Sequence, residues 1–392
     1  MLTNNNKFTV DVVHMVFTIF SFMQASQQST HSPFSIRHSL SSPFILLFLI
    51  VFISGTSKSE ELETDVLEDQ WPVFAAQLSD DILAHCQSNK CHMNVIDANT
   101  LVSLMSEHDL ALDLKEALAL SEYEVLISSA VLFSSYPSLS KDTLEQEASS
   151  ILRLEITTSW RGIPIDDFNI EQSISGQDYS AEQTNALTNT AFIMLSQWID
   201  RAKEEDILAA EKIYAQLGAS NYFEQLKLPE RIGDFVKFEQ GLYHDPMQGS
   251  ITRYVHPDYE DAIVDISVYP VSPFVHREKS LEDSVTNEML IEKSQIQALI
   301  EHANIKDFMI SDIQTTKLNL GNRQLPALAM EVALETSIDP VYSTQFLFTQ
   351  HDKFVKLTGN LPKSMMLALV QDSLSDIEVP DESEFMRAMR QK

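Results

Sequence analysis

Two cysteines separated by four residues are the residues of this chain whose spacing most directly suggests chemistry. Cys86 and Cys91 lie in the segment HCQSNKCH, flanked by His85 and His92. Cysteines this close can form a disulfide when their Cα atoms lie about 4.4–6.8 Å apart. Two thiolates and two imidazoles could also hold zinc, although this is not a standard zinc spacing and adjacent side chains point in different directions. The pattern predicts a Cys86–Cys91 disulfide, with free thiols and a metal site as alternatives.

A second group of polar residues lies in the segment HPDYED. His256, Asp258, Glu260 and Asp261 have the side chains of a divalent-ion or general-acid site. Pro followed by Asp is, however, typical of a turn. We therefore expect a polar hairpin turn between two strands.

Two further groups carry chemically useful side chains. His351, Asp352 and Lys353 are adjacent, and a turn joining two strands is the preferred interpretation. Trp160 and Arg161 fall in a stretch without clear periodicity. An exposed aromatic ring beside a guanidinium is typical of interaction hot spots, so this pair is the candidate interaction site.

No catalytic motif stands out from the rest of the sequence. There is no G-x-S-x-G nucleophile elbow, and 9 glycines leave little material for phosphate-binding loops. Paired carboxylates of the glycosidase kind need only be close in space, so the sequence does not test for them. We assign no catalytic residue, cofactor or metal, and favour a protein that is not an enzyme.

The charge balance restricts the class of partner. The chain has 392 residues, with 27 Lys and Arg against 57 Asp and Glu, which gives a formal net charge of -30. Such acidity argues against nucleic acid, whose phosphates need a basic surface. It also argues against attachment to anionic lipid through a polybasic patch. The acidity is expected to serve solubility. An acidic face that docks a cationic partner or collects divalent ions is the alternative, but no block of consecutive acids supports it.

The first part of the chain has the features of a targeting segment, residues 1–59. Residues 43–53 are almost wholly apolar, with Arg37 before them and small residues after them. A basic region, a short apolar run and small residues are typical of a secretory signal. Eleven helical residues are too short to cross a bilayer, which argues against a permanent anchor. An uncleaved tether to the inner membrane at residues 43–57 is therefore only the alternative. Because a start at Met23 would give a normal signal length, residues 1–22 suggest a misassigned start. A pair of helices that includes the apolar stretch at residues 16–22 is the alternative.

The mature chain is expected to have two parts of different periodicity. Apolar residues in the first part recur every three or four positions, which predicts a helical region over residues 60–226. We expect an irregular stretch at about residues 158–179. A long helix is expected over residues 181–217, with Gly218 as its stop.

The second part, residues 227–392, alternates with the period of strands. The predicted order is β-β-β-α-β-β-β-β-α, with Ser280 and Asp283 capping the first helix and Gly321-Asn322 in a hairpin turn. An antiparallel sheet with a helix on each face gives an α/β/α sandwich. The expected fold class is therefore α+β, with a helical N-terminal region. The expected core stripes of the two helices are Val285, Met289, Ile296 and Ile300, and Met366, Val370, Leu374 and Ile377.

Residues 228–362 resemble a group of bacterial exported proteins of unknown function with a PsbP-like C-terminal domain. The resemblance rests on LPERIGDFVKFE (228–239), GSITRYVHP (249–257), AIVDISVYP (262–270) and DKFVKLTGNLP (352–362). These motifs are structural rather than catalytic. PsbP-like domains act as binding or assembly modules, which is what the resemblance implies here.

Two functions are expected from this pattern. The first is an exported, periplasmic envelope protein that binds or assembles with another envelope protein, with membrane contact only through an uncleaved N-terminal segment. The alternative is an enzyme or small-ligand carrier with its site in a cleft between the two regions. The alternative requires His85, His92, His256 and His351 to approach one another or a carboxylate cluster.

Overall fold

A computed structural model describes residues 72–88, 91–107, 123–134, 149–175, 181–273, 280–302, 307–334 and 341–391. The predicted signal, the alternative tether and the expected start at Met23 lie outside the described residues. The described residues form two compact units, divided between Glu205 and Asp206. We call them the N-terminal unit, residues 72–205, and the C-terminal unit, residues 206–391. The division falls earlier than the boundary expected after residue 226.

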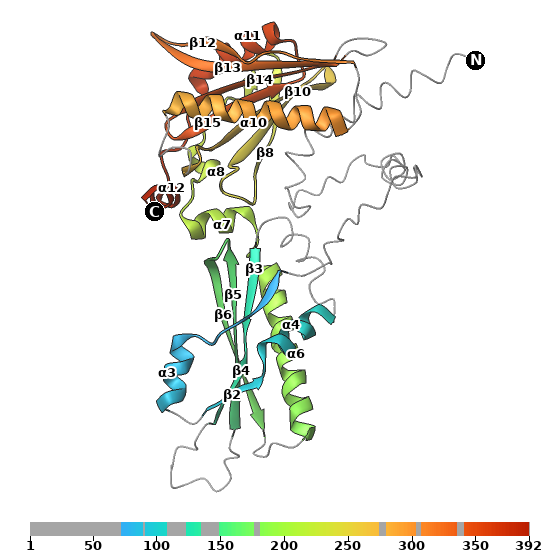
Figure 1. The fold of residues 1–392 in the computed structure, drawn as a ribbon, viewed down its shortest axis with the longest axis vertical. Coiled ribbons are helices and arrows are strands. Elements are labelled where there is room, and N and C mark those ends of the chain that lie inside the picture. Colours follow the sequence, from blue (N-terminus) through green and yellow to red (C-terminus); the bar gives the residue numbers. More distant parts are fainter. Residues whose placement is uncertain are drawn as a thin grey trace, which may run out of the picture. The chain divides into compact units, whose positions relative to one another are not determined.

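The N-terminal unit is built on a six-stranded sheet. Its strands are β1 (Val73–Ala76), β2 (Cys91–Ile96), β3 (Tyr123–Ser128), β4 (Ala130–Ser134), β5 (Ser149–Trp160) and β6 (Ile163–Ser175). Its helices are α3 (Asp80–Ser88), α4 (Ala98–Glu107) and α6 (Ala181–Glu204). On one side β5 pairs with β3 and β4, and on the other side it pairs with β6. Figure 1 shows α6 running alongside this sheet.

The prediction of a helical region over residues 60–226 is wrong for this sheet. Strand β5 alternates buried side chains with partly buried ones, as in the buried Leu152, Leu154 and Ile156. β3 and β4 are short and nearly continuous, and their closely spaced apolar residues also fit a helical stripe. Periodicity alone does not separate the two structures in apolar runs this short.

The long helix expected after β6 is present but interrupted. α6 ends at Glu204, and a separate helix, α7 (Ala210–Leu217), belongs to the C-terminal unit. Gly218 ends α7 in the left-handed conformation, with φ 64°, so the predicted stop is confirmed.

The C-terminal unit contains a nine-stranded antiparallel sheet in the order β11-β13-β14-β15-β10-β9-β8-β7, with β12 also paired to β13. Its strands are β7 (Arg231–Ile232), β8 (Phe235–Leu242), β9 (Ser250–His256), β10 (Tyr259–Pro270), β11 (Phe308–Ile310), β12 (Gln314–Leu320), β13 (Arg323–Leu334), β14 (Val341–Gln350) and β15 (Lys353–Gly359). Its remaining helices are α8 (Tyr222–Gln225), α10 (Leu281–His302), α11 (Lys363–Ser373), the 3₁₀ turn η1 (Leu374–Asp376) and α12 (Glu384–Gln391). The chain is therefore α+β, with largely antiparallel sheets.

Two apolar clusters fix the helices of this unit against its sheet. α10 packs on one side through Val285, Met289, Ile296 and Ile300, as predicted, together with sheet residues such as Leu347. The other cluster joins α7, α8, α11 and η1 to the opposite side chains of the sheet, and it includes the predicted Met366, Val370, Leu374 and Ile377. Figure 1 shows α10 lying across the strands.

Local signals in the C-terminal unit are read correctly from the sequence. Ser280 and Asp283 cap α10 reciprocally: the Asp283 amide donates to Ser280 Oγ at 3.1 Å, and the Ser280 amide donates to Asp283 Oδ2 at 3.2 Å. The hairpin at Gly321-Asn322 joins β12 to β13. α12 and the two-residue β7 are not predicted.

One residue at the edge of the C-terminal sheet is bonded by a side chain. The amide group of Gln371, on α11, bonds both backbone groups of Asn319 on β12, accepting from the Asn319 amide at 2.8 Å. None of the helices in the described part of the chain is long and apolar enough to span a membrane.

Candidate functional site

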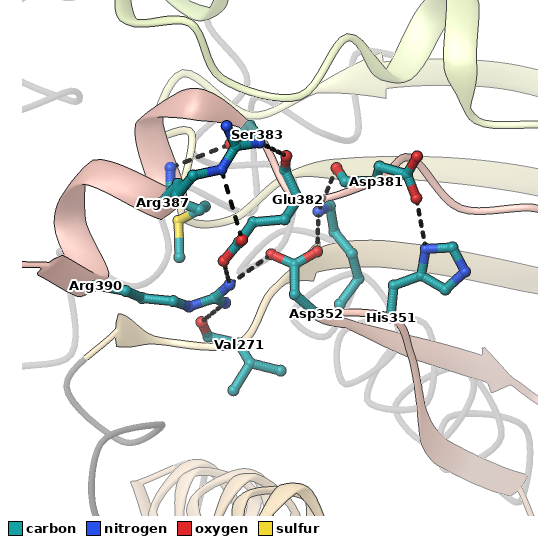
Figure 2. A network of polar contacts seen from close by, with 10 residues as sticks. Val271, His351, Asp352, Asp381, Glu382, Ser383, Arg387 and Arg390 are labelled. Carbon is teal, nitrogen blue, oxygen red and sulfur yellow. Dashed lines mark hydrogen bonds and ion pairs between the residues drawn. The ribbon is translucent and has the colours of Figure 1, made fainter.

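The C-terminal helix α12 is held to the sheet by a network of charged side chains (Figure 2). Ser383 begins this helix, since its Oγ accepts from the Met386 amide at 3.2 Å. Phe385 and Met386 face the interior. Arg390 lies one helical turn beyond Met386, so the helix directs its guanidinium to the turn between β14 and β15.

Asp352, in that turn, is the centre of the network. Lys353 Nζ donates to Asp352 Oδ1 at 2.6 Å, and Arg390 donates to Asp352 Oδ2 at 3.0 Å. Arg390 also donates to the Val271 carbonyl at 2.9 Å and pairs with Glu382. Figure 2 shows Arg390 between Asp352, Glu382 and Val271. The carboxylate of Asp352 therefore connects α12 to the β14–β15 turn, and Arg390 also connects α12 to the end of β10.

Lys353 is the most deeply buried charged group of this network, with 0% of its surface exposed. Burial lowers the pKa of Lys353, while the hydrogen bond and negative charge of Asp352 act in the opposite direction. Burial, and secondarily the charge of Asp352, raise the pKa of Tyr222 on α8. Because Lys353 Nζ also donates to the Asp381 carbonyl at 3.3 Å, the ammonium is enclosed by acceptors. This geometry suits a structural clamp better than a nucleophile.

A second polar cluster lies between α10 and the sheet. Tyr269 donates to Glu288 Oε1 at 3.0 Å, and Lys356 pairs with Glu292. Burial raises the pKa of Glu288, the nearby charge of Glu292 adds to this, and the bond from Tyr269 opposes it. These contacts fix the side of α10 that faces β10 and β15.

A further charged pair on the same sheet joins β9 to β10. Arg253 binds Asp265 with two nitrogen–oxygen contacts of 2.9 and 3.0 Å. The bidentate geometry of a largely buried pair orients both strands. The cluster therefore helps to hold α10 and the strands in register.

β6 of the N-terminal unit is a long strand with an open side. It spans Ile163–Ser175, 13 residues, and among the described strands it pairs only with β5. Arg201 of α6 supports it from one face, donating to both carboxylate oxygens of Asp166 at 2.8 and 3.0 Å. The guanidinium also lies 4.5 Å from the ring centroid of Phe168. These contacts with α6 therefore hold the edge strand β6 in a fixed position.

The expected interaction pair at Trp160 and Arg161 needs correction. Trp160 is 1% exposed, because it ends β5 on the face covered by α6 and pairs in register with Tyr123. Arg161 and Gly162 have φ of 47° and 74°, which makes a two-residue turn with both φ positive between β5 and β6. Arg161 is exposed and lies 4.7 Å from the Trp160 ring centroid. The exposed aromatic platform is therefore not formed.

The structure joins Cys86 and Cys91 in a disulfide, with Cα atoms 5.2 Å apart. The two cysteines of the alternative metal site are thus bonded to each other in this structure. His85 packs against the ring of Phe133, at 5.1 Å between centroids. His92 is exposed on β2. In the described ranges, no group of three or more His, Cys, Asp or Glu side chains is placed to hold a metal ion.

The four histidines named in the sequence lie at separate places. His256 ends β9, where its Nδ1 accepts from the Asp258 amide at 3.1 Å and its ring contacts Phe235 and Tyr259. This is a hairpin turn, as expected. His351 lies in the β14–β15 turn and pairs with Asp381 at 3.0 Å, where both side chains are exposed. Within each described unit these histidines do not approach one another, which was one of the two arrangements expected of an enzyme; His351 does contact a carboxylate, that of Asp381.

Sequence reasoning missed the roles of Arg390 and β6. The signal for α12 is short: Ser383 followed by Phe385 and Met386, with arginines on the other positions. The signal for β6 is the alternation of Phe168, Ile170 and Ile174 with polar residues.

No protein-family model and no curated protein matches the chain. Among solved structures, it is similar to cyanobacterial PsbP (CyanoP) from Synechocystis sp. PCC 6803, at 9% identity over 37% of this chain and 82% of that one, with a TM-score of 0.26. It is also similar to a chain of the Tle4–Tli4 complex, at 12% identity over 65% and 74%, TM-score 0.22. The immunity protein TplEi of the T6SS from Pseudomonas aeruginosa matches at 12% over 65% and 74%, TM-score 0.21. TM-scores this low do not establish a shared fold.

Proposed function

We propose that this is an exported, non-catalytic binding module that docks another envelope protein by adding a strand to β6. Its C-terminal unit would be a PsbP-like α/β/α sandwich that serves as the second part of the module. The single observation that carries the proposal is that, among the strands that the structure describes, β6 has a neighbour on one side only, over a length of 13 residues.

An open strand edge favours binding because its backbone groups are free to pair with another chain. Proteins usually protect such edges by shortening, covering or interrupting them. In β6 a proline occurs only near the beginning, at Pro164, and residues 166–174 contain neither proline nor glycine. Extended peptides bind edges of this kind through main-chain hydrogen bonds. The Arg201 contacts with Asp166 and Phe168 hold the strand in place before binding, which lowers the entropic cost of association.

The disulfide supports the exported location. Disulfides persist in oxidising compartments such as the periplasm, and Cys86 and Cys91 are bonded. The apolar run at residues 43–53 supplies the corresponding signal in the sequence.

The test is site-specific photo-crosslinking in the cells that produce the protein. A photoreactive residue replaces Asn169, exposed on β6, or Asn189, exposed on α6 of the same unit. We expect one adduct of defined mass from position 169 in the envelope fraction and none from position 189. Equal crosslinking at both positions, absence of an adduct at position 169, or retention of the protein in the cytoplasm would overturn the proposal.

A further inference from the structure

We infer that the segment added to β6 alternates apolar side chains with lysine or arginine. This inference rests on the proposed function and gives the partner a chemistry. It follows from the two kinds of side chain that border the open edge.

The side of β6 that faces α6 carries three apolar residues, besides Asp166, which pairs with Arg201, and the exposed Gln172. Phe168 contacts Arg201 of that helix, and Ile170 is buried. Because side chains alternate along a strand, Ile174 shares this face. Phe168 and Ile174 are only partly covered. Ile193, on α6, is 52% exposed. An added strand with apolar side chains on this face would extend the packed layer beneath the helix.

The other side of β6 is acidic. Asp167 accepts from Thr157 Oγ1 at 2.7 Å, and Glu171 lies 3.6 Å from Arg153, both partners being on β5. Glu171 keeps 54% of its side chain exposed. A carboxylate offers about four acceptor positions, so each retains capacity toward the open side.

The spacing of these carboxylates sets the spacing of the charges in the partner. Asp167 and Glu171 are four residues apart on one face, or about 13 Å along the strand. Residues directly opposite on neighbouring strands have Cβ atoms about 4.5–5.5 Å apart, and opposite charges there stabilise the pair. Basic residues four positions apart in the added strand would meet both carboxylates.

A second copy of this chain is a poorer occupant of the edge. Antiparallel pairing of two β6 strands centred on Asn169 sets Asp167 of one copy opposite Glu171 of the other. Like charges directly opposite one another are destabilising. The chain as a whole carries a net charge of -30, which adds long-range repulsion.

The test measures fluorescence anisotropy of labelled nine-residue peptides with the full chain. The probe peptide alternates Val and Lys, and its counterpart alternates Val and Glu. We expect the Val/Lys peptide to bind about tenfold more tightly, since two attractive cross-strand pairs replace two repulsive ones. Methylation of alternate backbone nitrogens should abolish binding for one of the two sets of amides, the set that faces β6.

A matched pair of charge reversals locates the site. Asp167→Lys with Glu171→Lys should invert the preference toward the Val/Glu peptide. The control is Asp200→Lys with Glu204→Lys, two exposed acids of α6 with the same spacing. Both variants change the net charge equally, so the control should keep the preference for Val/Lys.

The outcomes separate this inference from the proposed function. If both peptides bind equally, or both reversals act equally, but methylation still blocks binding, the basic partner is wrong and strand addition stands. If neither peptide binds, or if binding survives methylation of each of the two sets of amides, strand addition at β6 and the proposed function both fail.

Discussion

The Arg390 network makes a quantitative prediction about the C-terminal end. The substitution Arg390→Gln removes the guanidinium that joins Asp352, Glu382 and the Val271 carbonyl. The side chains of Arg390 and Asp352 are each 11% exposed, so solvent screens their interaction little. Removing one partner of a buried pair costs about 3–5 kcal/mol.

The lower end of that range is expected here, because Asp352 keeps its contact with Lys353 at 2.6 Å. A loss of about 3 kcal/mol would lower the melting temperature of a unit of this size by about 6–12 °C. The matched control is Arg387→Gln on the same helix. Arg387 is 56% exposed and lies 3.9 Å from Glu382, so its removal should cost no more than about 1 kcal/mol.

The assay is urea unfolding followed by two signals. Trp71, Trp160 and Trp198 all precede Asp206, so tryptophan fluorescence reports the N-terminal part of the chain. Far-UV circular dichroism reports both units. The Arg390→Gln variant should shift the transition seen by dichroism but not by fluorescence. A loss below about 1 kcal/mol, or equal losses for the two arginines, would refute the assignment of a buried clamp.

Three further predictions use the same unfolding measurement. Burial raises the folded-state pKa of Glu288, so the stability that its protonated form contributes is complete below about pH 4.3 and is lost as the pH rises through that raised pKa. Glu288→Gln should therefore match the stability of the wild type at about pH 4 and exceed it at neutral pH. The reverse order would contradict this. Gly249→Ala should prevent stable folding of the C-terminal unit, because at φ 67° a Cβ would overlap a neighbouring strand. Gly321→Ala, at φ 58° with open space around it, should cost only about 1–2 kcal/mol of stability. Similar losses for the two variants would contradict the close approach of the strands at Gly249. Replacing Cys86 and Cys91 by serine should destabilise the N-terminal unit by about 2 kcal/mol, read by tryptophan fluorescence, and an unchanged midpoint would show that the loop contributes nothing.

The C-terminal unit was predictable because its local signals agree with its packing. The alternation of Val264, Ile266 and Val268 places all three in one core cluster. The helical stripe that includes Met289 packs on the other side of the sheet. Where each segment has one clear period and a recognisable cap or turn, the sequence specifies type and face together.

The N-terminal unit was predicted poorly because its strands depend on distant pairing. Val125 and Leu132 are spaced as in a helix, yet they belong to two short strands that pair with opposite halves of β5. Register between segments is not encoded in local periodicity. The candidate site could not be predicted for the same reason. The sequence alone does not show that β3 and α6 bury Trp160, and no local signal reveals that β6 lies at an edge.

The contacts between Gln371 and Asn319 have a consequence for how the protein tolerates crowding. The backbone N–H and C=O of Asn319 already bond an amide from the same chain, so this residue of the sheet edge offers no free backbone groups to a strand of another molecule. At Asn319, Gln371 therefore protects the edge of β12 against pairing with another molecule.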